Sequence, residues 1–300
     1  MKRKEDYKQF LKPDVVSKLG NMELIARLVV EGFIVGLHKS PYHGFSAEFA
    51  EHRPYNFGDS PRFIDWKLYA KSDRYYVKEF EEETNTRCYI ILDKSASMNY
   101  SSHTVTKFEY GAYLAAALSY LMNKQQDAVG LILYDDAIRE NLHPSSTRIQ
   151  LFNILKTLQT VTPGGETRIL DVITDIVGGI KKRSLVILIS DLLEEPEEII
   201  RAVKQLRYRK NEVLLFHIID PKERFFDFPG DAIFEDMETG ERLQTHPWAI
   251  RTDYQANFLR FANAIKYQCE EIQIDYTPLL TTSDFSLALL EYLHKRSRLY

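Results

Sequence analysis

The sequence predicts an α/β fold: an open, mostly parallel sheet with helices on both faces, preceded by a smaller N-terminal segment. From Cys88 onward, short apolar runs alternate with helical patterns, which favours a sheet with helices packed around it. Each run is nearly continuous in Val, Ile and Leu, as is typical of strands buried on both faces of a parallel sheet. The predicted strands are Tyr89–Leu92, Ala128–Tyr134, Ser184–Ser190 and Val213–Ile219.

Start signals place the helices between these runs. Thr106 and Glu109 have the spacing of a capping box, which opens a helix that continues to about Lys124. Ser146 is expected to cap a helix over Thr147–Leu158, and Pro196 lies in the first turn of the helix that precedes the last run. On the helix over 147–158, helical spacing predicts a buried stripe of Ile149, Phe152, Leu155 and Leu158.

Composition excludes several classes of protein. The net charge of −4, from 39 basic and 43 acidic residues, gives no electrostatic footprint for nucleic acid. Two cysteines, Cys88 and Cys269, are too few for a disulfide framework. No apolar run is long enough to span a membrane, and Met1–Lys12 lacks the apolar core of a signal peptide. We therefore expect a cytoplasmic protein with no membrane span and no nucleic-acid partner.

Common catalytic and metal-binding motifs are also missing. The eight histidines show no HExxH spacing, so a zinc site is not expected. No GxxxxGK[ST] phosphate loop and no GxSxG nucleophile elbow occur. The sequence therefore assigns no catalytic residue.

Acidic and hydroxyl side chains follow two of the predicted strands. Asp93, Ser95 and Ser97 come directly after the first strand, and Asp191 comes directly after Ser184–Ser190. Right-handed crossovers place the carboxyl ends of parallel strands at one edge of the sheet, where ligands bind in such folds. Oxygen ligands of this kind suit Mg²⁺, although Asp and Ser at these positions would also serve as turn and cap residues.

A loop between these strands carries further candidates. Gly164 and Gly165 permit a tight turn, which would present Glu166 and Thr167 before a helix that begins near Ile169. Two acids and three hydroxyls are then expected to converge on one crevice.

The pattern Asp93-x-Ser95-x-Ser97, a loop Thr167 and Asp191 after a later strand resembles the metal-ion-dependent adhesion site of von Willebrand factor A domains. The resemblance implies that Ser95 and Ser97 bind Mg²⁺ or Mn²⁺ directly, and that Thr167 binds it directly or through water. Asp93 and Asp191 would act mainly through water and hydrogen bonds. A site of this kind leaves a coordination position open to a carboxylate from a partner. Glu166 would be an additional contact to the metal or the partner.

The N-terminal third carries a further pattern of residues: Gly44, Glu48, Arg53, Tyr55, Gly58, Asp59, Arg62, Ile64, Asp65, Trp66 and Ala70. This pattern resembles a bacterial family, domain of unknown function 58, whose members carry this segment just before an A-type domain. The resemblance implies a segment over residues 1–87 that packs on a von Willebrand factor A-like domain over residues 88–300. It also implies a MoxR-type AAA+ ATPase as a partner. Charged and aromatic residues of the segment are expected to contact either this partner or the A-type domain: Arg53, Asp59, Arg62, Asp65 and Trp66.

These features favour a non-enzymatic, metal-dependent interaction module, an adaptor or scaffold that works with the MoxR-type ATPase or its client protein. The alternative is a metal-dependent hydrolase at the same strand ends, for which Glu166 is the evident spare general base. A third possibility is a scaffold whose metal is structural. A hairpin around Thr239 and Gly240 has no assigned purpose. The basic cluster His294–Arg298 is expected to be a solvated helix end.

Overall fold

The computed structural model describes residues 7–38, 52–54, 69, 75–78, 86–180 and 183–297. The chain forms two compact units, one made of Met1–Gly36 and Thr86–Tyr300 and the other of Leu37–Asn85. In the smaller unit, strands β1 (His52–Pro54) and β2 (Tyr76–Lys78) pair antiparallel. Residues 1–87 are therefore divided between the two units, and their first part groups with the α/β unit.

The larger unit is built on a sheet of six strands in the order β10-β7-β6-β3-β4-β5. Five strands are parallel, and the edge strand β5 runs antiparallel to β4. The predicted fold class is confirmed, and its four predicted strands form the centre of the sheet. The two outer strands, β5 and β10, were not predicted. The bounds are β3 (Arg87–Asp93), β4 (Ala128–Tyr134), β5 (Ile138–Ser145), β6 (Leu185–Ser190), β7 (Glu212–Ile219) and β10 (Asp275–Leu280).

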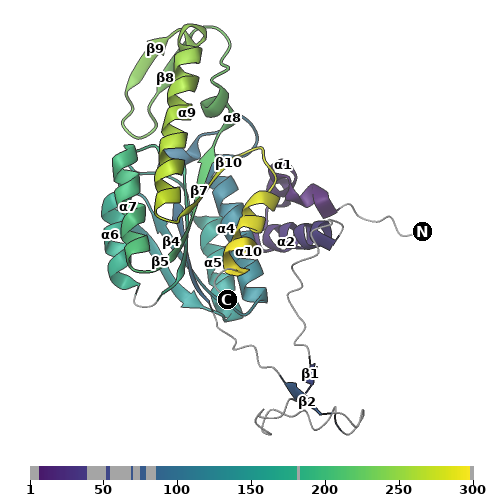
Figure 1. The fold of residues 1–300 in the computed structure, drawn as a ribbon. Helices are drawn as coiled ribbons and strands as arrows, with labels where there is room; N and C mark the ends of the chain where they lie inside the picture. The colour runs from purple at the N-terminus through teal and green to yellow at the C-terminus, as the bar shows by residue number, and fades with distance from the viewer. Residues whose placement is uncertain are drawn as a thin grey trace, which may run out of the picture. The chain divides into compact units, whose positions relative to one another are not determined.

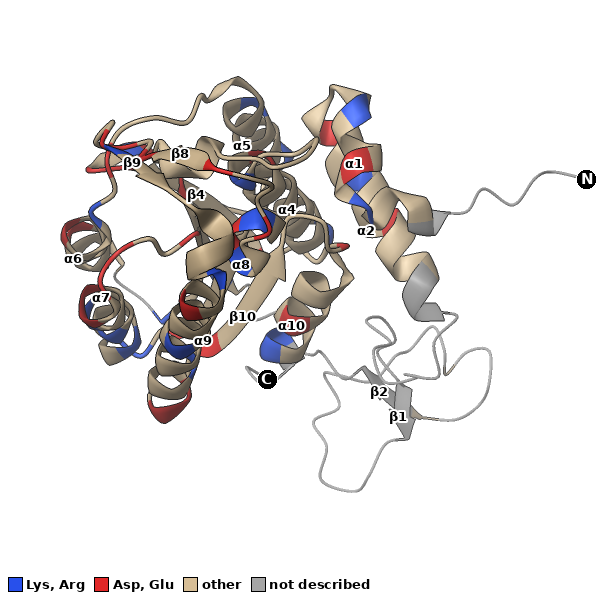
Figure 2. Cartoon of the chain, turned by 90° about the horizontal axis from the view of Figure 1, so that it is seen from above, with Lys and Arg blue, Asp and Glu red and all other residues tan. Residues whose placement is uncertain are grey.

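Helices cover both faces of this sheet (Figure 1 and Figure 2). One face is covered by α6 (Ile169–Gly179), α7 (Pro196–Tyr208) and the C-terminal part of α9 (Pro247–Glu271). The other is covered by α4 (Lys107–Lys124), α5 (Arg148–Thr160) and α10 (Ser286–Ser297). Among the described helices, none combines the length and the apolar character needed to cross a bilayer.

The N-terminal helices pack onto the α5 and α10 side of this unit. They comprise the 3₁₀ turns Tyr7–Leu11 and Ser17–Leu19, α1 (Pro13–Val16) and α2 (Met22–His38). The Gln159 side chain of α5 donates to the Gly20 carbonyl and accepts from the Met22 amide. The Leu11 carbonyl accepts a bond of 3.1 Å from the Phe285 amide, just before α10. Together with the buried apolar face of α2, these bonds explain why this segment belongs to the larger unit.

Local sequence signals predicted the start of α4 correctly, but they misplaced the cap and part of the buried face of α5. The capping box of Thr106 and Glu109 is present at the start of α4. The cap of α5 is Thr147, not Ser146. Ile149 and Phe152 were predicted to be buried, but they are 73% and 60% exposed. The buried face of α5 is rotated toward Ile154, Leu155 and Leu158, because the helix packs against α4, β4 and the edge strand β5.

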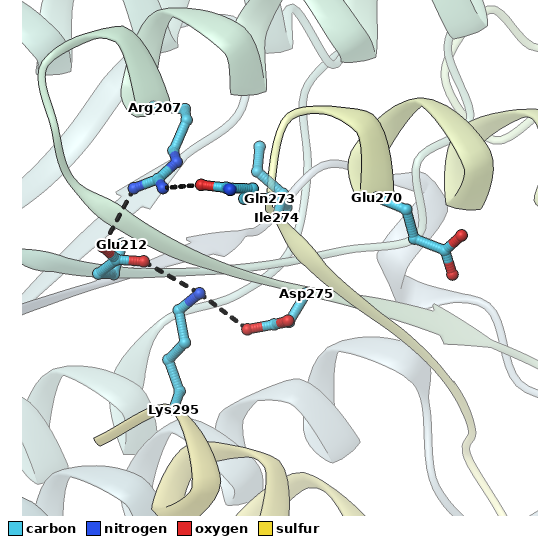
Figure 3. A pocket seen from close by; sticks show the side chains of 7 residues that line it. All are labelled: Arg207, Glu212, Glu270, Gln273, Ile274, Asp275 and Lys295. Carbon is cyan, nitrogen blue, oxygen red and sulfur yellow. Dashed lines mark hydrogen bonds and ion pairs between the residues drawn. The ribbon is translucent and has the colours of Figure 1, made fainter. Parts of the chain in front are cut away.

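The C-terminal basic cluster was predicted to be solvated, and this is wrong for two of its residues. Lys295 is 7% exposed, and its Nζ lies 3.1 Å from Glu212 and 2.8 Å from Asp275. Arg296 pairs with Asp127. Figure 3 shows the hollow in which Lys295 lies, at the amino ends of β7 and β10, where Glu212 also accepts from Arg207. These ion pairs compensate the charge of Lys295 and explain why it is buried at this edge of the sheet.

The pairing of β4 with β5 depends on Gly130. The register shifts between Val129 and Leu131, and a Cβ at Gly130 would lie 2.5 Å from the Leu142 carbonyl oxygen. We expect Gly130→Ala to lower the free energy of unfolding by about 1–3 kcal/mol, because the β5 backbone has to move. Gly178→Ala is the control, since no atom lies within 4 Å of its added Cβ, and stability should be unchanged or higher by up to about 1 kcal/mol. Urea denaturation measures the free energy of unfolding of both variants. Equal losses of stability would contradict the conclusion that the register shift at Gly130 requires glycine.

Candidate functional site

The parallel pairing of β3 with β6 brings two acids to the carboxyl edge of the sheet. Leu92 lies opposite Ile189 in the register, so the chain reaches Asp93 and Asp191 at neighbouring strand ends. Both carboxylates are buried, with 0% and 2% exposure. Two buried acids at adjacent strand ends require compensation from the groups around them.

Asp93 is held by three donors. Its Oδ1 accepts a bond of 2.9 Å from the Ser95 amide, and its Oδ2 accepts from Ser190 Oγ at 2.8 Å and from the Tyr134 hydroxyl at 3.4 Å. Burial, and then the negative charge of Asp191, raise the pKa of Asp93 to about 7 in spite of these bonds. A cation at this edge would favour the ionised carboxylate.

The two serines of the motif lie together next to Asp93. Ser95 and Ser97 are buried, and their Oγ atoms are 3.1 Å apart. Ser97 begins a single 3₁₀ turn, Ser97–Asn99, which turns the chain back after the strand. The structure therefore brings both hydroxyls and the Asp93 carboxylate into one buried group.

The glycine loop lies alongside this group. The Gly164 amide donates to the Lys94 carbonyl at 2.7 Å, and the Ala96 amide donates to the Gly165 carbonyl at 2.9 Å. Gly165 has a φ of +91°, and an added Cβ would lie 3.0 Å from an Asp135 oxygen. The close approach and the positive φ both require glycine, as expected for a tight loop beside the motif.

Thr167 and Glu166 take different positions in this loop. Thr167 is half-buried, and it donates from Oγ1 and from its amide to the carboxylate of Glu238, at 2.9 Å and 3.1 Å. The Glu166 side chain is 58% exposed and lies 3.7 Å from the Arg168 guanidinium. Glu166 thus lies at the surface, whereas Thr167 contacts an acid that the sequence did not point to.

A buried lysine completes the carboxyl edge. Lys107 has 0% exposure, and its Nζ lies 2.7 Å from Asp191 Oδ2 and 2.6 Å from Glu223 Oε1. Burial lowers the pKa of Lys107, but the charges of Asp191 and Glu223 outweigh this effect and raise it above its ordinary value. Sequence reasoning missed this residue. The available signal was a lysine in the first turn of a helix, where its charge opposes the dipole and needs an acidic partner.

The donor set at this edge fits Mg²⁺. Asp191 uses Oδ2 for Lys107, and its Oδ1 is buried without a hydrogen-bond partner among the described residues. Within the same part of the chain, no group of three or more His, Cys, Asp or Glu residues could hold a metal ion. A metal here would therefore rely on the hydroxyls of Ser95, Ser97 and Thr167 together with the two aspartates, which are hard oxygen donors.

The remaining predicted contact residues belong to the smaller unit. Arg53 lies in β1, opposite Val77 in the register. Asp59, Arg62, Asp65 and Trp66 lie outside the described residues.

Removal of the Lys107 ammonium should destabilise the fold strongly. Lys107→Met leaves Asp191 and Glu223 without their shared cation, and we expect the free energy of unfolding to fall by about 3–5 kcal/mol. Lys156→Met, on the exposed side of α5, is the control and should change it by less than about 0.5 kcal/mol. Chemical denaturation without added metal measures both. If the two variants lose the same stability, the buried ion pair is not a principal stabilising contact of this edge.

Two mycobacterial proteins are similar in sequence to this chain over most of its length. "Uncharacterized protein Mb1516" of Mycobacterium bovis is 25% identical over 247 residues, which cover 81% of this chain and 77% of the relative. "Uncharacterized protein Rv1480" of Mycobacterium tuberculosis matches with the same identity and coverage.

Comparison with solved structures finds matches at low sequence identity. An aerotolerance-related membrane protein from Bacteroides fragilis matches with a TM-score of 0.50 and 16% identity, over 71% of this chain and 99% of that chain. The VWA domain of SpRpn10 matches with a TM-score of 0.40 and 13% identity, over 69% and 94%. A family model described as "Protein of unknown function DUF58" matches residues 51–263, and the chain therefore belongs to the DUF58 family.

Proposed function

We propose that the protein is a metal-dependent interaction module that binds Mg²⁺, or Mn²⁺, at the carboxyl edge of its sheet. The observation that carries this proposal is the buried group of hydroxyls and aspartates at that edge, in which one Asp191 oxygen has no hydrogen-bond partner among the described residues. Buried polar oxygens without partners are rare in folded proteins, and a water molecule bound to a cation would supply the missing partner here.

The proposed roles follow from the donors. Ser95 and Ser97 hold the ion directly, and Thr167 holds it directly or through water. Asp93 and Asp191 act through water and hydrogen bonds, since both already accept bonds from protein donors. When bound, the ion supplies a positive charge with a position open to an acidic side chain.

The proposed partner is a MoxR-type AAA+ ATPase or its client protein, with this chain as adaptor or scaffold in the cytoplasm. Family membership supports the choice of partner. An acidic side chain of the partner would complete the coordination, which makes binding depend on the metal.

Binding is proposed in preference to metal-dependent hydrolysis. Hydrolysis needs a general base beside the metal and an activated water. Glu166, the candidate base, is exposed and lies next to Arg168. His217, the buried histidine on β7, is bonded to the Tyr276 hydroxyl, and burial lowers its pKa to about 4. The contacts of Glu166 and His217 therefore disfavour both as the general base, and binding is proposed for this reason.

Mg²⁺ should stabilise the folded chain through the serine hydroxyls. At ten times its dissociation constant, the ion should add about 1.4 kcal/mol, which raises the melting temperature by about 3–6 °C. The double variant Ser95→Ala/Ser97→Ala should lose this response. Ser119→Ala is the control, because it removes another buried hydroxyl, bonded within α4, and should keep the response. Calorimetry with and without Mg²⁺ checks this, and equal shifts in all three proteins would refute the assignment.

Capture of the partner should depend on the ion. We expect pull-down of the MoxR-type ATPase to fall at least about fivefold on chelation with EDTA and in Ser95→Ala/Ser97→Ala, because loss of a metal-mediated contact of about 1 kcal/mol or more has this effect. Ser119→Ala should bind as the wild type does. Loss in the double variant without loss on chelation would indicate a contact surface with no bridging ion. Indifference to both changes would place recognition elsewhere, with the Arg53–Trp66 segment as the next surface to test.

A further inference from the structure

The β8–β9 hairpin carries an acid to the candidate site from within the chain. β8 (Ala232–Glu235) and β9 (Arg242–Thr245) pair only with each other among the described strands, and they lie at the same end of the larger unit as α8 (Pro221–Phe225) (Figure 1). At the tip, Glu238 receives two bonds from Thr167, one of the proposed metal ligands.

The tip is organised to present this side chain. Asp236 Oδ1 accepts bonds from the amides of Glu238 and Thr239, at 2.8 Å and 2.9 Å. The Gly240 amide donates to the Asp236 carbonyl, and Gly240 has a φ of +74°. Glu238 is half-buried, whereas its tip neighbours Met237 and Thr239 are exposed. Hydrogen bonds within the turn thus hold the tip in a conformation in which the Glu238 carboxylate contacts Thr167.

Thr167 can serve Glu238 and a metal at the same time. A threonine hydroxyl has one proton to donate and two lone pairs to offer. Its proton goes to Glu238 Oε1, so the oxygen lone pairs remain available to a cation. The Glu238 carboxylate is then one hydroxyl away from the proposed ion, in the region where a partner's acid is expected.

The charges at this edge argue against a second acid beside Glu238. Glu194 is partly buried there, and burial, followed by the negative charges of neighbouring acids that include Glu238 and Asp191, raises the pKa of Glu194 to about 7. Another carboxylate would be repelled by these groups. A partner's acid would therefore bind best where Glu238 leaves.

The hairpin is attached in a way that allows the tip to leave. An isolated two-stranded hairpin is marginally stable in water. Its base is held by Phe234, whose ring packs against Phe226 and Phe228 with centroids 5.4 Å and 5.0 Å apart. Ile233 and Leu243 are more than 60% exposed. Among the described residues, the bonds from Thr167 to Glu238 are therefore the main polar contact between the tip and the rest of the unit.

From this geometry, and on the basis of the proposed function, we infer that Glu238 blocks the place from which a partner's carboxylate would reach the ion. The hairpin and an acidic partner then compete for one place beside the ion. A carboxylate held within the chain acts at an effective concentration of about millimolar, which sets the strength that an external acid must overcome.

Acetate is the probe, measured by calorimetry on the full chain saturated with Mg²⁺. We expect Glu238→Ala to bind acetate at least about tenfold more tightly than the wild type, because its own competitor is removed. Without Mg²⁺ this gain should vanish. Glu241→Ala removes a neighbouring exposed acid at the same tip and should match the wild type. The melting temperature of each variant checks that it is folded.

Hydrogen exchange gives a second readout that needs no metal. The Thr167 amide donates to Glu238, so Glu238→Ala should speed exchange at residues 164–168 and 232–245, whereas Glu241→Ala should leave both segments as in the wild type. Unchanged exchange would overturn the tie between the tip and the loop. If Mg²⁺ binds to every variant and acetate affinity is the same in all of them, the inference fails and the metal proposal stands. If Mg²⁺ binds to none, the proposed function fails, and the competition inferred here fails with it.

Discussion

The burial of two carboxylates at the ends of adjacent parallel strands is the constraint on which the rest of this edge depends. The register of β3 with β6 brings Asp93 and Asp191 to neighbouring positions out of contact with solvent. Charge removed from water must be compensated locally. The surrounding groups can be understood as that compensation: the hydroxyl of Ser190 and the amide of Ser95 for the first acid, and the ammonium of Lys107 for the second.

Lys107 supplies a permanent cation, and this shapes what the site can do. The capping box at Thr106 fixes the start of α4, and the lysine that follows it bonds to Asp191 and Glu223 in the interior. It satisfies one oxygen of Asp191 and leaves the other without a hydrogen bond in the described part of the chain. Because this ammonium balances Asp191 and Glu223 within the protein, the proposed ion is not needed for that balance. Such a division suits a site whose occupancy controls binding.

The two edges of the sheet differ in how completely their charges are paired. At the amino ends of β7 and β10, Glu212 binds Arg207 and Lys295, and Lys295 also binds Asp275 (Figure 3). The basic groups there match the acids, which is typical of a structural network. At the carboxyl edge, acids exceed bases, and the hairpin adds a further one through Glu238. The imbalance, more than the fold, distinguishes the edge proposed to bind a cation.

The sequence by itself determined the central strands, the capping box of α4 and the strand ends at which the acids and hydroxyls meet. These features follow from local periodicity, from cap chemistry and from the handedness of parallel crossovers, so they need no knowledge of distant contacts. Tertiary structure alone decided which face of α5 is buried and which residues reach the site. Lys107 meets Asp191 across 84 positions and Thr167 meets Glu238 across 71, and no local pattern encodes such pairs. The hairpin was visible in the sequence, but only the packed chain shows what its tip touches.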